Sequence, residues 1–550
     1  MISKILKVHP QDNVAVALTD LEAGEALAYG DEHYLLKSFV PAKHKFATVD
    51  IPKGAEVTMY GVLVGKTETD VPAGGLLTTA NLKHAAQDFS TGERRTGWQR
   101  PDVSQWEQMT FNGYHRADGS VGTANYWLVV PMVFCENRNL DVLQEALVND
   151  LGYGRNQGYQ QQTRQLIELY KTGKSVEEIL QADIKVNSTR QASHRLFPNV
   201  DGIKFLTHAG GCGGTRQDAQ ALCALLAGYI THPNVAGATV LSLGCQHAQV
   251  AMLQEEIGKR APVLGKPFYV LEQQEIGSES EMLSEALKRT FAGIMQANEN
   301  VRRPAPLSKL CIGLECGGSD GFSGISANPA IGYTSDLVVA LGGSVILSEF
   351  PELCGVEQDL SDRCVSQEDA ERFSFLMRTY NDRAHAVGSG FDMNPSPGNI
   401  KDGLITDAIK SAGAAKKGGT SPVVAVLDYP EKVTRPGLNL LCTPGNDVES
   451  TTAEVASGAN IVLFTTGLGT PTGNPVAPVI KIASNTKLYN KMRDIIDINT
   501  GTITEGEETI QQAGARILDY IIAVASGEAE VAAVRHGQDD FIPWKRGVSL

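Results

Sequence analysis

The sequence predicts an α/β protein in which a small β-rich N-terminal domain precedes two α/β domains with mostly parallel sheets. Short strand-like runs separated by Gly, Pro and Asp fill the first 85 residues. From about residue 111 onward, apolar strand-like runs alternate with helical segments, a pattern typical of parallel sheets covered by helices. The length of 550 residues also exceeds that of one ordinary domain.

The β-rich prediction covers residues 1–85. The runs NVAVAL, HYLLKSF, KFATVDI and EVTMYGVLVG are short, contain β-branched and aromatic residues, and are bounded by turn-forming residues. A small antiparallel barrel or sandwich fits this pattern. Residues 86–110 are polar and show no periodicity, which indicates a linker.

Two α/β domains are expected after this linker. Strand-like runs such as GIKFLTH and ATVLSLG each precede a helical segment, and the chain closes on the helical run ETIQQAGARILDYIIAVAS. The charged, Pro-containing stretch ENVRRPAPLS favours a boundary near residue 305, so we expect domains over residues 111–305 and 306–550. Residues 150–200 look like a polar helical insertion.

Charge and hydropathy limit the partners. The 48 basic and 63 acidic residues give a net charge of −15, which argues against a nucleic-acid partner but not against a small anionic substrate. The sequence contains neither a run of about 18 apolar residues nor a signal-peptide pattern. We therefore expect a cytoplasmic protein without a membrane segment.

Four of the nine cysteines lie at or just beyond the carboxyl ends of predicted strands: Cys135, Cys212, Cys245 and Cys316. In open α/β sheets small molecules bind at this edge. No CxxC pair supports a zinc ribbon. Thiolates from separate strand ends suit iron, either as Fe²⁺ or in an iron–sulfur cluster held by three or four cysteines. The alternative is that these cysteines are ordinary buried side chains.

Several Gly-rich polar turns could bind a small anion. Gly313–Pro329 (GLECGGSDGFSGISANP) holds five glycines, and similar turns occur in PSPGNIKDG, TPGNDVESTT and FTTGLGTPTGNP. Free N–H groups at helix N-termini bind anions, although Asn, Ser and Thr also simply cap helices and turns. No phosphate-loop or dinucleotide motif is present.

Five motifs of the sequence, four of them in or overlapping these turns, resemble the altronate/galactarate dehydratase family: GLECGGSDGFSGISANPAIGYTSD, SEFPE, NPSPGN, TPGND and TTGLGTPTG. The segment PAKHKFATVDIPKGAEVTMYG is similar to the N-terminal SAF-type domain of these enzymes, and ADGSVGTANYWLVVP also matches. The resemblance covers nearly the whole chain. FCENRN replaces an expected Gly-Cys-Val-Asn-like sequence, and residues 150–200 are longer than in the family. Both departures bear on the substrate more than on the reaction.

The resemblance implies a hydro-lyase that removes water from a sugar acid. The first candidate substrate is D-altronate, with 2-dehydro-3-deoxy-D-gluconate as product; galactarate and a sugar-acid binding protein without catalysis are the alternatives. The implied cofactor is Fe²⁺, with an iron–sulfur cluster or Mn²⁺ as alternatives. A cation suits this chemistry, because the C2 proton beside a carboxylate is a very weak acid.

The resemblance also assigns roles to residues. His44 becomes a candidate acid or base, with Glu349 and Glu352 as alternatives, and the four strand-end cysteines are the expected iron ligands. The residues expected to hold the carboxylate and hydroxyl groups are Asn125, Ser319, Asp320, Asn328, Asn394, Ser396, Asn399, Lys401 and Lys481. We expect the substrate to lie against Gly313–Pro329 and the protein to form a homo-oligomer, in the first place a dimer.

Overall fold

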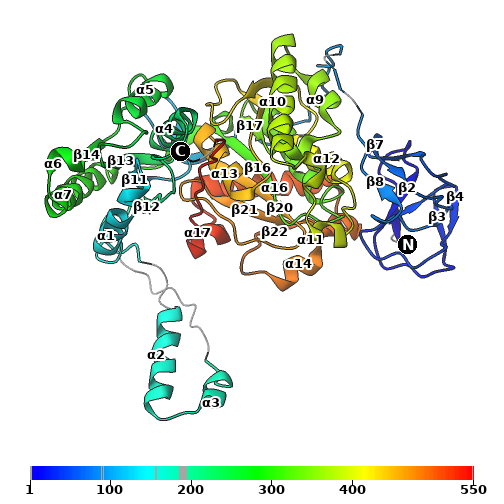
Figure 1. Cartoon of the computed structure of the whole chain (residues 1–550), viewed down its shortest axis with the longest axis horizontal. Coiled ribbons are helices and arrows are strands. Elements are labelled where there is room, and N and C mark those ends of the chain that lie inside the picture. Colours follow the sequence, from blue (N-terminus) through cyan, green and yellow to red (C-terminus); the bar gives the residue numbers. More distant parts are fainter. Residues whose placement is uncertain are drawn as a thin grey trace.

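The computed structural model describes residues 3–87, 89–90, 92–154, 158–184, 195–547 and 549. Figure 1 shows a small β-rich N-terminal region, a middle α/β region and a larger C-terminal α/β region. The predicted fold class is therefore confirmed. Among the described residues, none of the helices combines the length and the apolar character needed to cross a bilayer.

The N-terminal region consists of short antiparallel strands. They form two three-stranded sheets, in the orders β1-β2-β5 and β6-β7-β8, and the two-stranded ribbon β3-β4. Apolar side chains such as Val16 and Phe46 fill the small core between them. The strands are β1 (Ile5–Leu6), β2 (Val14–Ala17), β3 (Ala26–Tyr29), β4 (Glu32–Leu35), β5 (Lys45–Ala47), β6 (Glu56–Met59), β7 (Val62–Thr67) and β8 (Leu82–Lys83).

The middle region holds a four-stranded parallel sheet in the order β12-β11-β13-β14 and an antiparallel sheet in the order β10-β9-β15. Every residue of β11 and β13 is buried, as expected for parallel strands covered on both faces. Its strands are β9 (Thr110–His115), β10 (Val121–Gly122), β11 (Tyr126–Pro131), β12 (Gly202–Phe205), β13 (Val235–Ser242), β14 (Phe268–Glu272) and β15 (Arg303–Pro306). Its helices are η1 (Phe134–Glu136), α1 (Asn137–Val148), α2 (Gly158–Lys171), α3 (Val176–Leu180), α4 (Arg216–Thr231), α5 (Val250–Arg260), α6 (Gln273–Ile276) and α7 (Glu279–Ala297).

The expected polar helical insertion contains α2 and α3. A capping box at Ser175 begins α3. Residues 155–157 and 185–194, which also fall within the expected insertion, lie outside the described residues.

The C-terminal region is built on a seven-stranded parallel sheet in the order β18-β19-β17-β16-β20-β21-β22. Its strands are β16 (Cys311–Cys316), β17 (Ser344–Leu347), β18 (Val423–Leu427), β19 (Gly437–Leu441), β20 (Ile461–Thr466), β21 (Val479–Ala483) and β22 (Ile498–Asn499). The helices are η2 (Leu307–Lys309), α8 (Ala327–Ala340), η3 (Phe350–Leu353), α9 (Glu357–Arg363), α10 (Gln367–Ala386), η4 (Phe391–Met393), α11 (Pro397–Lys401), α12 (Asp407–Ala414), η5 (Ala415–Gly418), α13 (Asp447–Ser457), α14 (Thr486–Lys491), α15 (Gly501–Thr504), α16 (Ile510–Ser526) and α17 (Ala532–His536).

This strand order contains a topological switch point. The chain leaves β16 toward β17 on one side, whereas β20 continues to β21 on the other side. Adjacent connections diverge there, and in open α/β proteins ligands bind at such a position, outside the carboxyl ends of the strands.

The N-terminal region contacts the C-terminal region through the loop before β5. The Lys43 ammonium lies 3.0 Å from Asp320 and 2.8 Å from Asp402. Lys45 is fully buried, and its ammonium donates hydrogen bonds to the carbonyl oxygens of Lys43 at 3.0 Å and Gly403 at 2.7 Å. Burial lowers the pKa of Lys45 to about 7. The two regions are thus joined by ion pairs at the rim and by a lysine inside the contact.

The glycines of Gly313–Pro329 are needed for contacts within the chain. A Cβ atom at any of the five would meet another part of the protein within 3.3 Å. The nearest groups belong to Glu454, Asp447, Thr466, Lys43 and Tyr60, facing Gly313, Gly317, Gly318, Gly321 and Gly324 in that order. Lys43 and Tyr60 themselves adopt left-handed backbone conformations, with φ of +74° and +59°. The close approach that we expected of a substrate is therefore made largely by the protein itself.

Replacing Gly321 by Ala is expected to loosen the contact between the two regions. The added Cβ would overlap the carbonyl oxygen of Lys43, and overpacking of this kind costs about 1–3 kcal/mol. We expect a lower melting temperature and faster proteolysis of residues 86–110. Gly97→Ala is the matched control, because a Cβ there meets nothing within 4 Å. Equal melting temperatures of the two variants would contradict this packing.

The contact is also expected to strengthen as pH rises from about 7 to 10. The unfolded chain holds the Lys45 proton up to a pKa near 10.5, whereas the folded chain releases it near 7. The unfolded state therefore binds more protons in this window, and stability rises with pH by up to about 1.4 kcal/mol per unit. In calorimetry, Lys45→Met should show a smaller rise in melting temperature over this range than the wild type. An unchanged pH slope would contradict the assignment.

Candidate active site at the switch point

A buried cluster of three side chains lies at the switch point. Cys316 is the last residue of β16, Glu349 follows β17 closely, and Glu352 lies in η3. One ligand atom from each lies within 4.8 Å of the others, and all three residues are buried. We call Cys316, Glu349 and Glu352 the switch-point triad.

Glu349 is held in an unusual backbone conformation. Its φ of +60° and ψ of 57° are left-handed, which costs a non-glycine residue about 1–3 kcal/mol. Two hydrogen bonds fix it, one from its N–H to the Thr443 hydroxyl at 2.8 Å and one from the Cys316 N–H to its carboxylate at 3.1 Å. This geometry turns the Glu349 carboxylate toward the end of β16.

Two lysines neutralise the triad. Lys417, in η5, ion-pairs with Glu349 and donates a hydrogen bond to the Cys316 sulfur at 2.9 Å. Lys410, in α12, lies 2.6 Å from Glu352 and also contacts Asn394. Burial opposes both charges, yet the surrounding acidic groups raise the pKa of each lysine, so both are cations. Their charges offset the two carboxylates in a buried environment.

Glu315, inside β16, shares a proton with Glu349. Burial and the charge of Glu349 raise the pKa of Glu315 well above its ordinary value. Burial also opposes the charge of Glu349, but Lys417 and a hydrogen bond from Glu315 bring the pKa of Glu349 below its usual value. Glu315 is therefore a neutral acid beside an ionised carboxylate.

Two acidic side chains of α13 complete the site. Burial, together with Glu349 and Glu352, raises the pKa of Asp447 to about 7. Burial raises the pKa of Glu454 to about 8, although this carboxyl accepts hydrogen bonds from the Leu314 N–H and the Ser348 hydroxyl. Asp447 lies against Gly317. The site thus contains carboxyl groups that exchange protons near neutral pH.

The switch-point triad fits a first-row divalent cation. A thiolate and two carboxylates suit Fe²⁺ or Mn²⁺. Both carboxyl oxygens of Glu315 and one carboxyl oxygen of Glu349 are buried and accept no hydrogen bond from an N–H or hydroxyl group of the described residues. A proton or a cation must therefore lie between the two carboxyl groups. Burial and the two carboxylates raise the pKa of Cys316 well above its ordinary value, so a cation would have to displace its proton.

The four predicted cysteine ligands do not form one site. Cys316 is buried in the C-terminal region, whereas Cys135, Cys212 and Cys245 are exposed and follow strands of the middle region. Among the described residues, neither of the two groups close enough to share a metal ion includes any of these three. The sequence predicts correctly that each follows a strand, but not that the strands belong to two sheets.

The loops carrying the three exposed cysteines do contact each other. The Phe134 N–H donates to Gly210, and the Ala248 N–H donates to Gly211, each at 3.0 Å. Cys212 also lines a cavity of about 270 Å³ with His208 and residues 541–545. The His208 Nε2 atom lies 2.8 Å from the carbonyl oxygen of Pro131, and burial lowers the His208 pKa to about 4, so this ring is neutral.

The five recognised motifs meet around the switch point. Gly445, from TPGND, lies beside Asn394 and Glu352. The Gly467 N–H, from TTGLG, donates to the Gly318 carbonyl at 3.0 Å. Asn394 belongs to NPSPGN, and the remaining two motifs supply the triad itself. Segments far apart in the sequence therefore form one polar site.

Most predicted substrate-binding residues hold this site together. Asp320 accepts the Ser484 hydroxyl and pairs with Lys43, and Asn328 bridges the Gly413 carbonyl and the Thr465 hydroxyl. Ser396 and Asn399 form a capping box on α11, and the Asn399 amide also reaches the Ser319 carbonyl. The Ser319 hydroxyl is buried without a hydrogen-bond partner among the described residues. Its oxygen is therefore available to a ligand.

Four other predicted residues make no contact with the side chains of the switch-point triad among the interactions of the described residues. Asn125 lies just before β11, where its amide donates to two backbone carbonyls and its oxygen accepts from Arg116, and its role in substrate binding stays a prediction. His44 is half-buried at the interregional contact, where burial lowers its pKa. The Lys481 ammonium contacts Gln538, and burial lowers its pKa to about 8. Lys401 is exposed at the end of α11.

Sequence reasoning missed Lys410, Lys417, Glu315 and Glu454. A signal was present for the first two, since lysines seven residues apart lie on one face of a helical segment. Glu315 was visible as a carboxylate inside an apolar strand. Nothing in the local sequence indicates that Glu454, within α13, faces β16.

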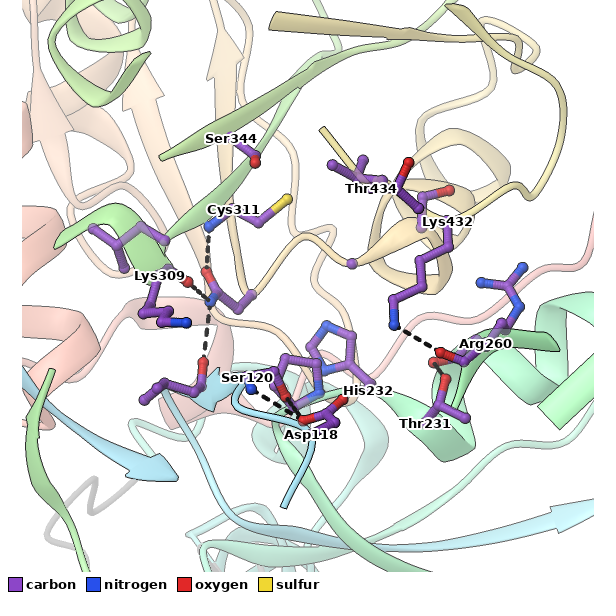
Figure 2. A pocket seen from close by; sticks show the side chains of 18 of the residues that line it. Asp118, Ser120, Thr231, His232, Arg260, Lys309, Cys311, Ser344, Lys432 and Thr434 are labelled. Carbon is purple, nitrogen blue, oxygen red and sulfur yellow. Dashed lines mark hydrogen bonds between the residues drawn. The ribbon is translucent and has the colours of Figure 1, made fainter. Parts of the chain in front are cut away.

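Figure 2 shows a different cavity, of about 400 Å³, lined by cationic side chains including Arg260, Lys309 and Lys432. Cys311 and Ser344, the first residues of β16 and β17, also line it. It therefore lies at the amino edge of the sheet, opposite the switch-point triad. Lys309 and Lys432 each donate to a backbone carbonyl at 3.0 Å.

Three family models match the chain. Residues 3–85 match the altronate/galactarate dehydratase SAF domain, residues 113–298 the second domain of D-galactarate dehydratase/altronate hydrolase, and residues 307–549 the C-terminal domain of D-galactarate/altronate dehydratase. The predicted division into domains at residues 85, 110 and 305 stays a prediction.

Curated relatives match over the full length. The chain is 34% identical to altronate dehydratase of Escherichia coli (strain K12) over 99% of both chains. It is 33% identical to altronate dehydratase of Bacillus subtilis (strain 168) over 100% of both chains. It is 32% identical to galactarate dehydratase (L-threo-forming) of Escherichia coli (strain K12), over 97% of this chain and 94% of the relative.

Lys417→Met is expected to destabilise the C-terminal region by about 3–5 kcal/mol, because it leaves the buried Glu349 carboxylate without its cation. The double variant Lys417→Met/Glu349→Gln should recover part of this loss in calorimetry. Lys416→Met, at the exposed neighbouring residue, is the matched control. If the double variant is no more stable than the single one, the two charges do not compensate each other.

Proposed function

Because the chain belongs to the altronate/galactarate dehydratase family, we propose that it is an iron-dependent dehydratase that converts D-altronate to 2-dehydro-3-deoxy-D-gluconate and water. Membership makes it a hydro-lyase acting on a sugar acid. Altronate is favoured because two full-length relatives carry the name altronate dehydratase. Galactarate is the second candidate, since a galactarate dehydratase is nearly as similar. The cytoplasmic location and the homodimer stay predictions.

The observation that carries this proposal is the switch-point triad with its two lysines. Dehydration removes the C2 proton and the C3 hydroxyl, and the resulting enol tautomerises to a 2-keto-3-deoxy acid. The difficult step places further negative charge beside a carboxylate. A strand-end site with two buried lysine ammonium groups, proton-exchanging carboxyl groups and ligands for a cation suits that step.

Cys316, Glu349 and Glu352 would hold the iron, which when bound supplies Lewis-acid neutralisation of the substrate's charge. Lys410 and Lys417 orient the ligand carboxylates through their ion pairs. Glu315, as a neutral acid, can give a proton toward the departing hydroxyl. Asp447, beside Gly317, is the carboxyl whose proton affinity suits removal of a proton near neutral pH. His44 stays an untested candidate for the same role.

An anaerobic assay with Fe²⁺ tests the proposal. We expect keto-acid formation from D-altronate in preference to galactarate, and loss of turnover on adding a chelator. Binding of both sugar acids without conversion would instead favour a binding protein. Full activity of the metal-free protein would exclude the role of iron.

Cysteine variants test where the iron lies. Cys316→Ser is expected to lower kcat by about 100-fold or more and to reduce the iron content. The triple variant Cys135→Ser/Cys212→Ser/Cys245→Ser is the comparison and should keep both. The opposite result, with iron lost from the triple variant and kept in Cys316→Ser, would transfer the iron to the middle region as a three-cysteine cluster.

A further inference from the structure

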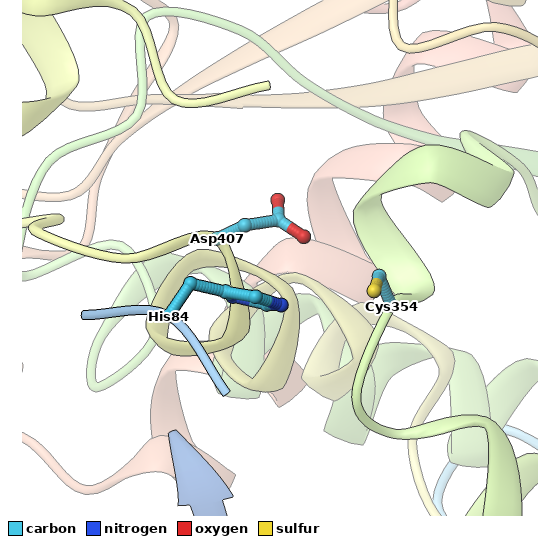
Figure 3. Close-up of side chains that lie close together, drawn as sticks. All are labelled: His84, Cys354 and Asp407. Carbon is cyan, nitrogen blue, oxygen red and sulfur yellow. The ribbon is translucent and has the colours of Figure 1, made fainter. Parts of the chain in front are cut away.

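A second group of metal-binding side chains lies between the N-terminal and C-terminal regions. His84 follows β8, Cys354 directly follows η3, and Asp407 is the first residue of α12. One ligand atom from each lies within 4.8 Å of the others. Figure 3 shows the three side chains converging from three separate segments. We call His84, Cys354 and Asp407 the seam cluster.

Asp407 is the unexplained member of this cluster. Its residue is 1% exposed, and neither carboxyl oxygen accepts an N–H or O–H hydrogen bond from the described residues. A buried carboxylate without donors is costly. Burial and the negative charge of Glu352 raise the pKa of Asp407 well above its ordinary value, although Lys410 opposes this effect. The chain therefore contains a buried acidic side chain whose one hydrogen-bond donor among the described residues is the weakly donating thiol of Cys354.

The other two ligands can reach this carboxyl. The Cys354 thiol contacts Asp407, and its pKa is raised by burial and by Glu357 and Asp407. The His84 Nδ1 atom accepts a long hydrogen bond of 3.3 Å from the Ala408 N–H, which places the ring on the first turn of α12. Burial lowers the pKa of His84, while Asp392 opposes this, so the ring is available as a neutral ligand. Both residues are only partly buried, which leaves a route for an ion.

The donor set selects a class of ion. An imidazole nitrogen, a thiolate and a carboxylate suit Zn²⁺, Fe²⁺ or Co²⁺, whereas Mg²⁺ and Ca²⁺ prefer oxygen ligands only. Ligand atoms around a tetrahedral zinc ion lie about 3.5 Å apart, so the seam cluster needs only a small contraction. Ligation displaces the proton of Cys354 and replaces the weak thiol contact of Asp407 with a cation.

We propose that the seam cluster binds a zinc-type divalent cation that joins the N-terminal region to the C-terminal region. This site is separate from the switch-point triad and does not depend on the proposed function. It acts on the triad indirectly: Asp407 begins α12, and Lys410 of the same helix holds Glu352. An ion at the seam cluster would fix the start of α12 and so the position of Lys410.

Cobalt titration of the full chain tests the proposal. Co²⁺ bound by a thiolate gives a charge-transfer absorption band, which reports the site without any activity assay. The chelator-treated protein should carry the triple substitution Cys135→Ser/Cys212→Ser/Cys245→Ser to remove the exposed thiols. We expect Cys354→Ala in this background to lose one equivalent of Co²⁺ and part of the band. Cys316→Ser should lose a different equivalent, and the two losses should add.

Stability provides the second readout. Asp407→Asn keeps the shape of the side chain and removes a ligand oxygen that can carry a charge, so the variant is expected to fold and to lose the rise in melting temperature that Zn²⁺ gives the parent protein. His84→Gln should weaken Co²⁺ binding at least tenfold, and His33→Gln, at an exposed histidine of β4, is the matched control. Equal Co²⁺ equivalents and equal band intensity in the parent and in Cys354→Ala would overturn the proposal.

Discussion

The C-terminal region depends on the balance between carboxylate and lysine charges inside a buried site. Five carboxyl groups and a thiol gather near the carboxyl ends of β16 and β17. All of them belong to buried residues except Asp447, which is half-buried. Two lysine ammonium groups, each within hydrogen-bond distance of a triad carboxylate, offset part of this charge. The remaining groups stay neutral by keeping protons, as the raised pKa values of Glu315 and Glu454 indicate. Ion pairs buried in this way stabilise little by themselves, and their retention points to chemistry.

The fold class could be predicted because it depends on local patterns. Alternating strand-like and helical runs have only a few ways to bury their apolar faces, and the parallel sheets follow from that restriction. The site could be predicted only in part. Motif recognition identified the loops that meet, including the triad residues Cys316, Glu349 and Glu352, because their glycines and polar residues are unusual in sequence. The grouping of cysteines failed, because strand-end position is local whereas membership of a sheet is decided by long-range pairing.

The residues missed by sequence reasoning share a physical reason. Lys410 and Lys417 lie in an ordinary-looking helical segment, and lysines in such segments are normally solvated. Only the packing of α12 and η5 against the ends of β16 and β17 makes them buried counter-ions. Asn125 shows the opposite case: it follows a glycine-containing turn within a recognised motif, yet both N–H groups of its amide already donate to backbone carbonyls at the start of β11, which its sequence context does not indicate.

The three non-glycine residues with left-handed backbones in the described part of the chain are Lys43, Tyr60 and Glu349, and all contact the Cys316–Gly324 stretch. Such conformations persist only where neighbouring structure imposes them. Tyr60 and Gly61, both with positive φ, form the two-residue turn between β6 and β7, so the hairpin sets the backbone of Tyr60, whereas the Lys43 carbonyl lies against Gly321 and Gly403 of the C-terminal region. A change of sequence in either N-terminal loop would therefore be felt in the polypeptide that follows β16, since the two are packed directly against each other.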